Sequence, residues 1–187
     1  MTLATVVGLL ALVALVAWAV LVFNRLVRLR NQVRTAWADI DVQLQRRHDL
    51  VPSLVSTVQG YAGHERALLE SVTALRNQAM AAQSSPRQLA PIEDALQQGL
   101  GRLLAVVEAY PDLKASDNFM QLQRDLVGIE EHLQFARRFY NGAVRDYDNA
   151  LQRFPDVIAA RAFSFRGAEY FQAADEDRAA VQVEFPR

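Results

Sequence analysis

The stretch RRHDLVPSLV, Arg46 to Val55, places a proline inside a pattern that otherwise predicts one long amphipathic helix. Apolar residues on both sides recur at alternating steps of four and three, and this register passes through Pro52 without an insertion or a deletion. A proline inside a helix removes one backbone donor and crowds the carbonyl four positions earlier, here that of His48. Because the register is preserved, we predict a kinked but continuous helix that extends to about Ala82. A short interruption before Pro52 is the alternative.

Two charged residues interrupt the apolar stripe of this helix. Arg47 and Glu65 are 18 positions apart, roughly 27 Å along a helix, so they cannot pair with each other within it. In one interpretation the stripe drifts around the helix and both side chains reach water; in the other, each is buried in an ion pair that fixes the register. We favour the first. The stripe comprises Val33, Trp37, Ile40, Leu44, Arg47, Val51, Leu54, Val58, Tyr61, Glu65, Leu68, Val72, Leu75 and Ala79.

A second and a third helix are predicted downstream. Ser85 is a good N-cap and Pro86 suits the first helical position, so the second helix begins there and runs to about Tyr110. The third begins at a cap formed by Ser116 or Asp117, and its apolar residues alternate steps of three and four as far as Phe154.

The remaining sequence completes an all-α prediction. Pro155 ends the third helix, and the segment DVIAARAFSFRGAEYF after it is expected to pack as a short fourth element. No stretch shows strand alternation of useful length. The predicted fold is an N-terminal transmembrane helix that continues into a long kinked helix and forms an antiparallel bundle of three long helices plus a short C-terminal element.

The stretch LATVVGLLALVALVAWAVLVF, Leu3 to Phe23, contains no charged residue and would reach roughly 31 Å as a helix. A cleaved signal peptide needs a basic region before the apolar run and a cleavage motif after it, and neither is present. We therefore predict an uncleaved membrane anchor. The expected organisation is an anchor over residues 1–24, a cytoplasmic bundle over 25–168 and an acidic tail over 169–187.

Cations flank only one side of the predicted span. Arg25, Arg28, Arg30 and Arg34 follow it, and no basic residue precedes it. The positive-inside rule then places the N-terminus outside and the C-terminal bulk in the cytoplasm, with these four arginines at the membrane surface.

Composition and motifs exclude several classes of function. Twenty basic residues are balanced by 21 acidic ones, so nucleic acid is not an expected partner. The chain has no cysteine, which excludes disulfides, thiolate catalysis and cysteine-based zinc sites. His64 and Glu65 begin like a zinc-protease helix, but Leu68 occupies the position of the second histidine. His132 lacks the glutamate of a di-iron bundle, since Ile129 stands there. We expect ordinary helix-surface or interface histidines, and neither an enzyme, a metal nor a cofactor.

Several blocks in order carry a resemblance that covers nearly the whole chain. They are WADIDVQLQRRHDLVPSLVSTVQGYAGHE from Trp37, ALRN from Ala74, AYPDLKAS from Ala109 and ARRFYNGAVRDYDNALQRFP from Ala136. With the short N-terminal span, these blocks resemble the LemA family. The chain departs from the family pattern at two positions. The family commonly has asparagine at the position of Ser53, and a second Tyr-Asn pair is usual at the position of Asp148.

The resemblance implies a bacterial, membrane-anchored helical bundle without an established enzymatic activity. A magnetosome protein of the same family implies a role in shaping or organising membranes. Members of the family are frequently accompanied by a membrane zinc metalloprotease, which implies an adaptor role. The leading hypothesis is a non-enzymatic scaffold of the bacterial inner membrane, and the alternative is an adaptor or regulator of such a protease. An enzyme is the least supported class, because no nucleophile, base and orienting group occur together.

Helix lengths predict self-association. A first helix from Arg25 to Ala82 would extend roughly 87 Å, whereas the second would return only about 38 Å. The stretch from Arg25 to Val55 would then have no long helix of its own chain beside it, and its stripe would need another subunit or the folded-back C-terminal segment. We predict a homo-oligomer, with membrane lipids as the other partner. Its interface would contain Val33, Trp37, Ile40, Leu44, Arg47 and Val51.

Overall fold

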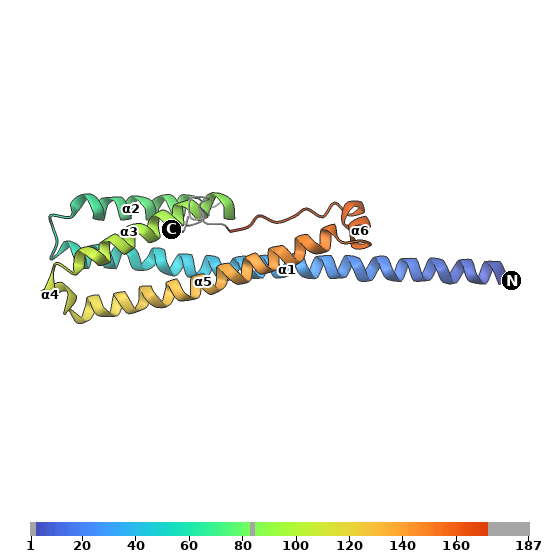
Figure 1. Ribbon diagram of the computed structural model, residues 1–187, viewed down its shortest axis with the longest axis horizontal. Coiled ribbons are helices and arrows are strands. Elements are labelled where there is room, and N and C mark those ends of the chain that lie inside the picture. Colours follow the sequence, from blue (N-terminus) through green and yellow to red (C-terminus); the bar gives the residue numbers. More distant parts are fainter. Residues whose placement is uncertain (1–2, 83–84, 172–187) are drawn as a thin grey trace, which may run out of the picture. The chain divides into compact units, whose positions relative to one another are not determined.

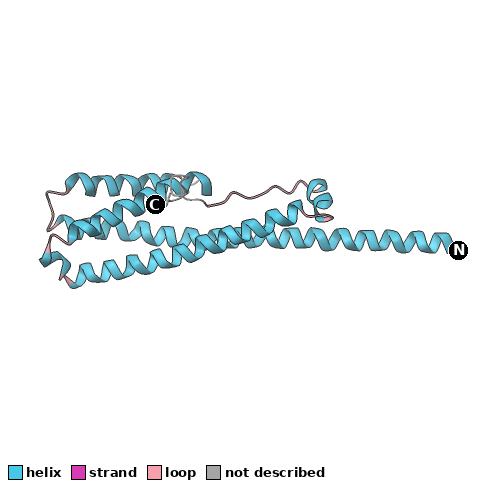
Figure 2. Cartoon of the chain, in the orientation of Figure 1, coloured by secondary structure: helices cyan, strands magenta, loops and turns pink. Residues whose placement is uncertain are grey.

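The computed structural model describes residues 3–82 and 85–171. Within these residues it contains six helices and no strand, which confirms the all-α prediction (Figures 1 and 2). The helices are α1 (Leu3–Gln59), α2 (Arg66–Ala81), α3 (Pro86–Val107), α4 (Pro111–Lys114), α5 (Asp117–Gln152) and α6 (Asp156–Ala162).

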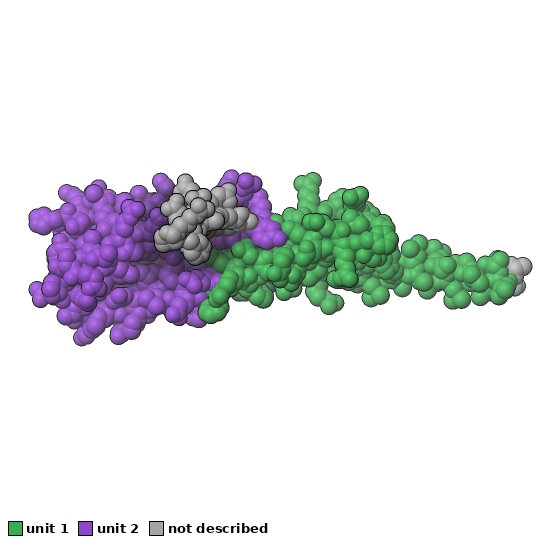
Figure 3. Space-filling model, in the orientation of Figure 1, with its two compact units in different colours: residues 1–41, 135–168 green, residues 42–134, 169–187 purple. Residues whose placement is uncertain are grey.

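The chain divides into two compact units (Figure 3). Unit 1 comprises residues 1–41 and 135–168, and unit 2 comprises residues 42–134 and 169–187. The helices α1 and α5 each contribute one part to either unit. The predicted division into anchor, bundle and tail stays a prediction, and the tail beyond Phe171 lies outside the described residues.

The helix α1 runs through Pro52, as the preserved register predicted. It ends at Gln59, however, so the predicted extension to Ala82 is wrong. The chain turns at GYAGHE, where the backbone N–H groups of Tyr61 and Ala62 both donate to the carbonyl of Val58, at 3.1 and 2.8 Å. The apolar stripe predicted a single helix because α1 and α2 each bury one face, so the three-four spacing of apolar residues continues across the turn. The two glycines of GYAGHE were the better signal.

Unit 2 packs the end of α1 with α2, α3, α4 and the first half of α5. Gly99 of α3 lies close to α2, because a Cβ there would lie 3.2 Å from Cγ2 of Val72. The core consists of Val51, Leu54, Val58, Ala62, Leu69, Val72, Leu96, Leu100, Leu103, Val107, Leu113, Phe119 and Leu126.

The predicted caps of the later helices are confirmed. The Ser85 hydroxyl accepts a hydrogen bond from the backbone N–H of Gln88 at 3.3 Å, and Pro86 is the first residue of α3. The Ser116 hydroxyl accepts from the N–H of Phe119 at 3.2 Å at the start of α5. These contacts satisfy backbone donors that a helix start leaves unpaired. The short helix α4 lies between α3 and α5, where only a turn was expected.

Unit 1 contains the first part of α1, the second half of α5, and α6. Here α5 packs along α1, with the ring centroids of Trp37 and Tyr140 at 5.4 Å. The helix α6 packs on the same α1 nearer its N-terminus, as predicted for a short fourth element. The core of this region consists of Val22, Leu26, Ala150, Ala159 and Ala160, with Trp18, Leu29, Leu151 and Phe165 packed around it.

Candidate functional site

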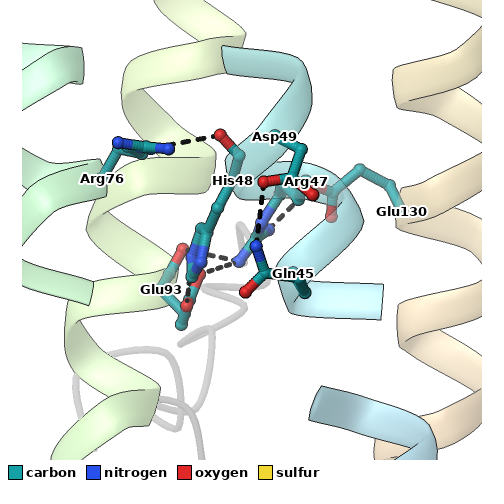
Figure 4. Close-up of polar contacts among 7 residues, drawn as sticks. All are labelled: Gln45, Arg47, His48, Asp49, Arg76, Glu93 and Glu130. Carbon is teal, nitrogen blue, oxygen red and sulfur yellow. Dashed lines mark hydrogen bonds and ion pairs between the residues drawn. The ribbon is translucent and has the colours of Figure 1, made fainter. Parts of the chain in front are cut away.

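Unit 2 contains a buried cluster of charged side chains from three helices (Figure 4). Arg47 of α1 pairs with Glu93 of α3, and its Nη1 donates to Oε1 of Glu130 on α5 at 2.8 Å. Nε2 of His48 lies 2.8 Å from the other oxygen of Glu93. Arg47 and Glu93 are both 0% exposed, and His48 is 5% exposed. The cluster therefore joins α1, α3 and α5 inside the unit.

Pro52, the proline of the opening stretch, makes a further contact possible next to this cluster. Pro52 has no N–H, so the carbonyl of His48 loses its donor within the helix. Nε of Arg76 on α2 donates to that carbonyl at 3.1 Å (Figure 4). A carbonyl freed by the proline thus holds α2 against α1. One short stretch of α1 binds the other long helices of unit 2 through Arg47, His48 and the His48 backbone.

Glu93 is ionised in this environment. Burial on its own raises the pKa of the Glu93 carboxyl, but the hydrogen bond from His48 and the positive charge of Arg47 outweigh it and hold the pKa below its ordinary value of 4.5. A carboxylate can only accept, so Nε2 of His48 carries the hydrogen that it shares with Glu93. The charges of Arg47 and Glu93 compensate each other away from water.

This geometry suits a structural role. Catalysis requires groups that a substrate can reach, whereas Arg47 and Glu93 have no exposed surface. Among the described residues, no group of three or more histidine or acidic side chains is placed to hold a metal ion. A buried network of this kind fixes the register of the helices that it joins, because any slip would leave a charge unpaired.

The sequence interpretation of Arg47 as a solvated side chain is wrong. Its partners were missed, although each occupies an apolar position of its own helix: Glu93 lies between Leu89 and Leu96, and Glu130 between Leu126 and Leu133. Glu65 has a different place, since its carbonyl accepts from the N–H groups of Leu68 and Leu69 at the start of α2. A carboxylate on each of two facing stripes was the signal for an internal ion cluster.

The stripe predicted as an oligomer interface is covered by the chain itself. Val33, Ile40, Leu44, Arg47 and Val51 are all buried, and Trp37 is half-buried with its ring near Tyr140. The expectation that this part of α1 lacks a helix of its own chain is wrong, because the turn after Gln59 shortens α1 and α5 returns along it. Self-association stays a prediction, but these residues are not exposed for it.

The four arginines predicted at a membrane surface lie in unit 1. Arg25 is half-exposed, and its Nη1 lies 2.6 Å from Oδ2 of Asp156 on α6. The guanidinium of Arg30 lies 5.3 Å from the ring centroid of Phe165. Arg28 and Arg34 are exposed. Two of the four thus also hold the α6 region against α1.

The apolar part of α1 is largely exposed. Leu3, Leu10 and Leu21 are 82%, 64% and 70% exposed. Among the described residues, α1 is the one helix long and apolar enough to cross a bilayer.

The sequence model of the LemA family matches residues 36–185. The chain belongs to the LemA family. This LemA protein is 25% identical over 192 residues to magnetosome protein MamQ 2 of Paramagnetospirillum magneticum, an alignment that covers 89% of this chain and 71% of the relative. It is 23% identical over 190 residues to magnetosome protein MamQ of Magnetospirillum gryphiswaldense, covering 88% and 70%. It is also 25% identical over 163 residues to protein LemA of Metamycoplasma hominis, covering 86% and 73%.

The resemblance derived from the sequence blocks is therefore confirmed. Together with the exposed apolar helix, the family and these relatives indicate a membrane-associated protein.

Proposed function

We propose that this LemA protein is a non-enzymatic, membrane-anchored helical scaffold that assembles with itself and organises or remodels the membrane. The observation that carries the proposal is the contrast along α1. Its stripe from Val33 onward is buried by the chain's own helices, whereas the stretch Leu3–Phe23 presents apolar side chains on nearly every face. Apolar surface contributes about 25 cal/mol per Å² when it leaves water, so this stretch belongs in hydrocarbon.

The proposed location is the bacterial inner membrane, with the N-terminus outside and the bundle in the cytoplasm. The supporting feature is the set of arginines that directly follows the apolar stretch. Arg28 and Arg34 are exposed, so their charges are available to lipid headgroups.

The buried ion cluster supports the non-enzymatic part of the proposal. Arg47 pairs with both Glu93 and Glu130 and so joins α1, α3 and α5, which means that the strongest polar feature of unit 2 is used inside the fold. Assembly requires surface that the chain leaves exposed. On α5, Phe135 and Phe139 are 64% and 53% exposed and lie one helical turn apart, which makes them candidates for contacts between copies.

The test is reconstitution of the full-length protein into lipid vesicles. We expect the protein, extracted in mild detergent, to crosslink into oligomers without added partners, and vesicles that contain it to change in size or curvature. Phe135→Ser with Phe139→Ser should lower crosslinking while the circular dichroism is retained. Gln123→Ser, an exposed polar position on the same helix, is the matched control. A protein that stays monomeric and leaves vesicles unchanged would contradict the scaffold.

A groove favours the second candidate, an adaptor or regulator of a membrane zinc metalloprotease. It has a volume of about 660 Å³ and lies on unit 2. An extended segment of a partner could lie there. Thr73→Arg should then abolish capture of a protease by a monomeric protein, while Arg66→Gln should only weaken it. The lining residues are Val55, Gln59, Gly63, Arg66, Leu69, Glu70, Thr73, Ala74 and Asn77.

A further inference from the structure

The segment around α6 joins unit 1 at a particular depth. Its packing partners on α1 include Trp18 and Val22, which lie inside the apolar stretch, and Leu26, which lies just beyond it. The rings of Phe163 and Phe165 stand 5.0 and 5.6 Å from that of Phe23, the last residue of the stretch. If the stretch spans a bilayer, α6 therefore lies where the span leaves it.

The segment is held there by defined contacts. The ion pair between Arg25 and Asp156 fixes the first turn of α6 to α1. At the other end, the N–H of Phe165 donates to the carbonyl of Ala160 at 2.9 Å, and that of Ser164 to the carbonyl of Arg161 at 3.2 Å. These bonds form a Schellman cap, and Ser164 occupies its left-handed position with φ of 54°. The aromatic residues after α6 are thereby held against α1.

The outer side of this segment is apolar and exposed. Phe154, Ile158 and Phe163 are 77%, 53% and 55% exposed. Ala159 and Ala160 of α6 are buried, so Ile158 lies on the face turned away from that core. The sequence pattern placed Phe154 at the end of the apolar stripe of the third helix, but α5 ends at Gln152 and Phe154 lies beyond it. Three large apolar side chains within ten residues need a surrounding other than water.

The same region is strongly basic. Residues 18–30 and 151–168 contain one carboxylate, Asp156, which Arg25 neutralises. A second carboxylate, that of Asp148 on α5, accepts from the N–H of Ala168 at 3.3 Å. The arginines there are Arg25, Arg28, Arg30, Arg153, Arg161 and Arg166. Basic side chains beside apolar ones are the composition that binds the interface of an anionic bilayer.

We propose that the α6 region is a second membrane contact, in which Phe154, Ile158 and Phe163 insert at the boundary between the headgroups and acyl chains of an anionic phospholipid bilayer. The proposal rests on the membrane anchorage proposed above. Lipid is the occupant that fits best, because the patch continues from the apolar stretch that would cross the bilayer. A second copy of the same surface would bring two surpluses of arginine together.

Single cysteines give a direct test, because the chain has none of its own. An environment-sensitive fluorophore is placed at Ile158→Cys or Phe163→Cys in the full-length protein. The protein is then embedded in nanodiscs of phosphatidylglycerol and phosphatidylcholine with brominated acyl chains. Both labels should be quenched by the bromine and protected from aqueous iodide. Helicity measured before labelling shows that each variant is folded.

Two control positions separate this proposal from the anchorage. A label at Leu12, in the middle of the apolar stretch, should be quenched by bromine. A label at Val127, which is 49% exposed and lies about 38 Å further along α5 from Gln152, should be quenched by iodide alone. Loss of bromine quenching at Leu12 would contradict the anchorage itself. Bromine quenching at Leu12 with iodide quenching at Ile158 would overturn only the second contact.

The remaining outcomes also test the proposed membrane contact. A label at Ile158 that neither quencher reaches would mean that protein covers the patch, from a second copy or from the chain itself, and would overturn the proposal. In discs of phosphatidylcholine alone, bromine quenching at Ile158 should fall at least about twofold. In the phosphatidylglycerol discs, Arg161→Gln with Arg166→Gln should reduce it in the same direction. Equal quenching under all these conditions would contradict the selection for anionic lipid.

Discussion

At the scale of single residues, unit 2 buries two charged side chains, Arg47 and Glu93, that no solvent reaches. Arg47 has two carboxylate partners, and Glu93 has two cationic or hydrogen-bonding partners. Removing one member leaves the others buried without full compensation, which is more damaging than the pair itself is stabilising. Glu93 is the member whose loss affects both Arg47 and His48.

Glu93→Gln should lower the free energy of unfolding by about 3 kcal/mol, since it leaves the buried guanidinium with Glu130 as its one carboxylate partner. The measurement is chemical unfolding of the detergent-solubilised protein at neutral pH, followed by circular dichroism. Glu70→Gln is the control, because that carboxylate is 71% exposed in an i, i+4 pair with Arg66, and its loss should change stability by less than about 0.5 kcal/mol. Equal effects of the two variants would show that the cluster contributes little.

The stability that Glu93 contributes should depend on pH in a known direction. Its pKa in the folded protein lies below the ordinary 4.5, so the unfolded chain takes up a proton first as the pH falls. The contribution is complete above pH 4.5 and is lost as the pH drops from there through the folded pKa. The difference in unfolding free energy between the wild type and Glu93→Gln should therefore be constant near neutrality and shrink below about pH 4.5. A difference that grows on acidification would contradict this assignment.

The link between Pro52 and Arg76 is testable by a double-mutant cycle. Pro52→Ala should preserve the fold and raise helicity, because Pro52 is exposed and alanine restores the N–H that pairs with the His48 carbonyl. Arg76→Met removes the donor from α2 and should cost about 1 kcal/mol in the wild type. It should cost less in the Pro52→Ala protein, where that carbonyl has a donor of its own. Additive effects would show that Arg76 does not act through this carbonyl.

At the scale of elements, local signals predicted most helix boundaries. The caps at Ser85 and Ser116 were recognisable because a side-chain oxygen at that position satisfies a free backbone donor. The turn after Gln59 was missed, because two amphipathic helices joined in register produce the same periodicity as one. That error also produced the expectation that the stretch from Arg25 to Val55 has no helix of its own chain beside it. Which carboxylate meets Arg47 depends on how the helices pack, so the sequence showed only that Glu93 occupied an apolar position.

The helices α2 and α3 pack so closely at Gly99 that a side chain there would press on Val72. Gly101→Ala should stabilise the protein by about 0.5–1 kcal/mol, because alanine favours the helix and its Cβ would meet nothing within 4 Å. Gly99→Ala has the same helical benefit, but its Cβ would lie 3.2 Å from Val72, a fully buried and stiff side chain. We expect Gly99→Ala to melt at a lower temperature than Gly101→Ala. The reverse order would mean that α2 moves away without cost.

At the scale of the whole molecule, the chain combines a braced helical bundle with an apolar stretch that the bundle leaves bare. The ion cluster and the apolar stripe of α1 from Val33 onward are buried by helices of the same chain, so their burial does not require another subunit. Among the described residues, the surfaces to which we assign a role are the apolar end of α1, the α6 region, the face of α5 with Phe135 and Phe139, and the groove of unit 2. The family and the two MamQ relatives agree with a membrane setting for them.

The orientation in that membrane can be tested on intact cells. The arginines after the apolar stretch favour the cytoplasm for everything that follows it, so a cysteine at Thr2, ahead of that stretch, should react with a membrane-impermeant thiol reagent and one at Gln123 should not. Gln123 is exposed, and the absence of native cysteine removes background labelling. Gln123→Cys should become reactive once the cells are lysed, which controls for burial. Labelling at Gln123 before lysis would reverse the orientation, and the six arginines near α6 would then face the outer leaflet.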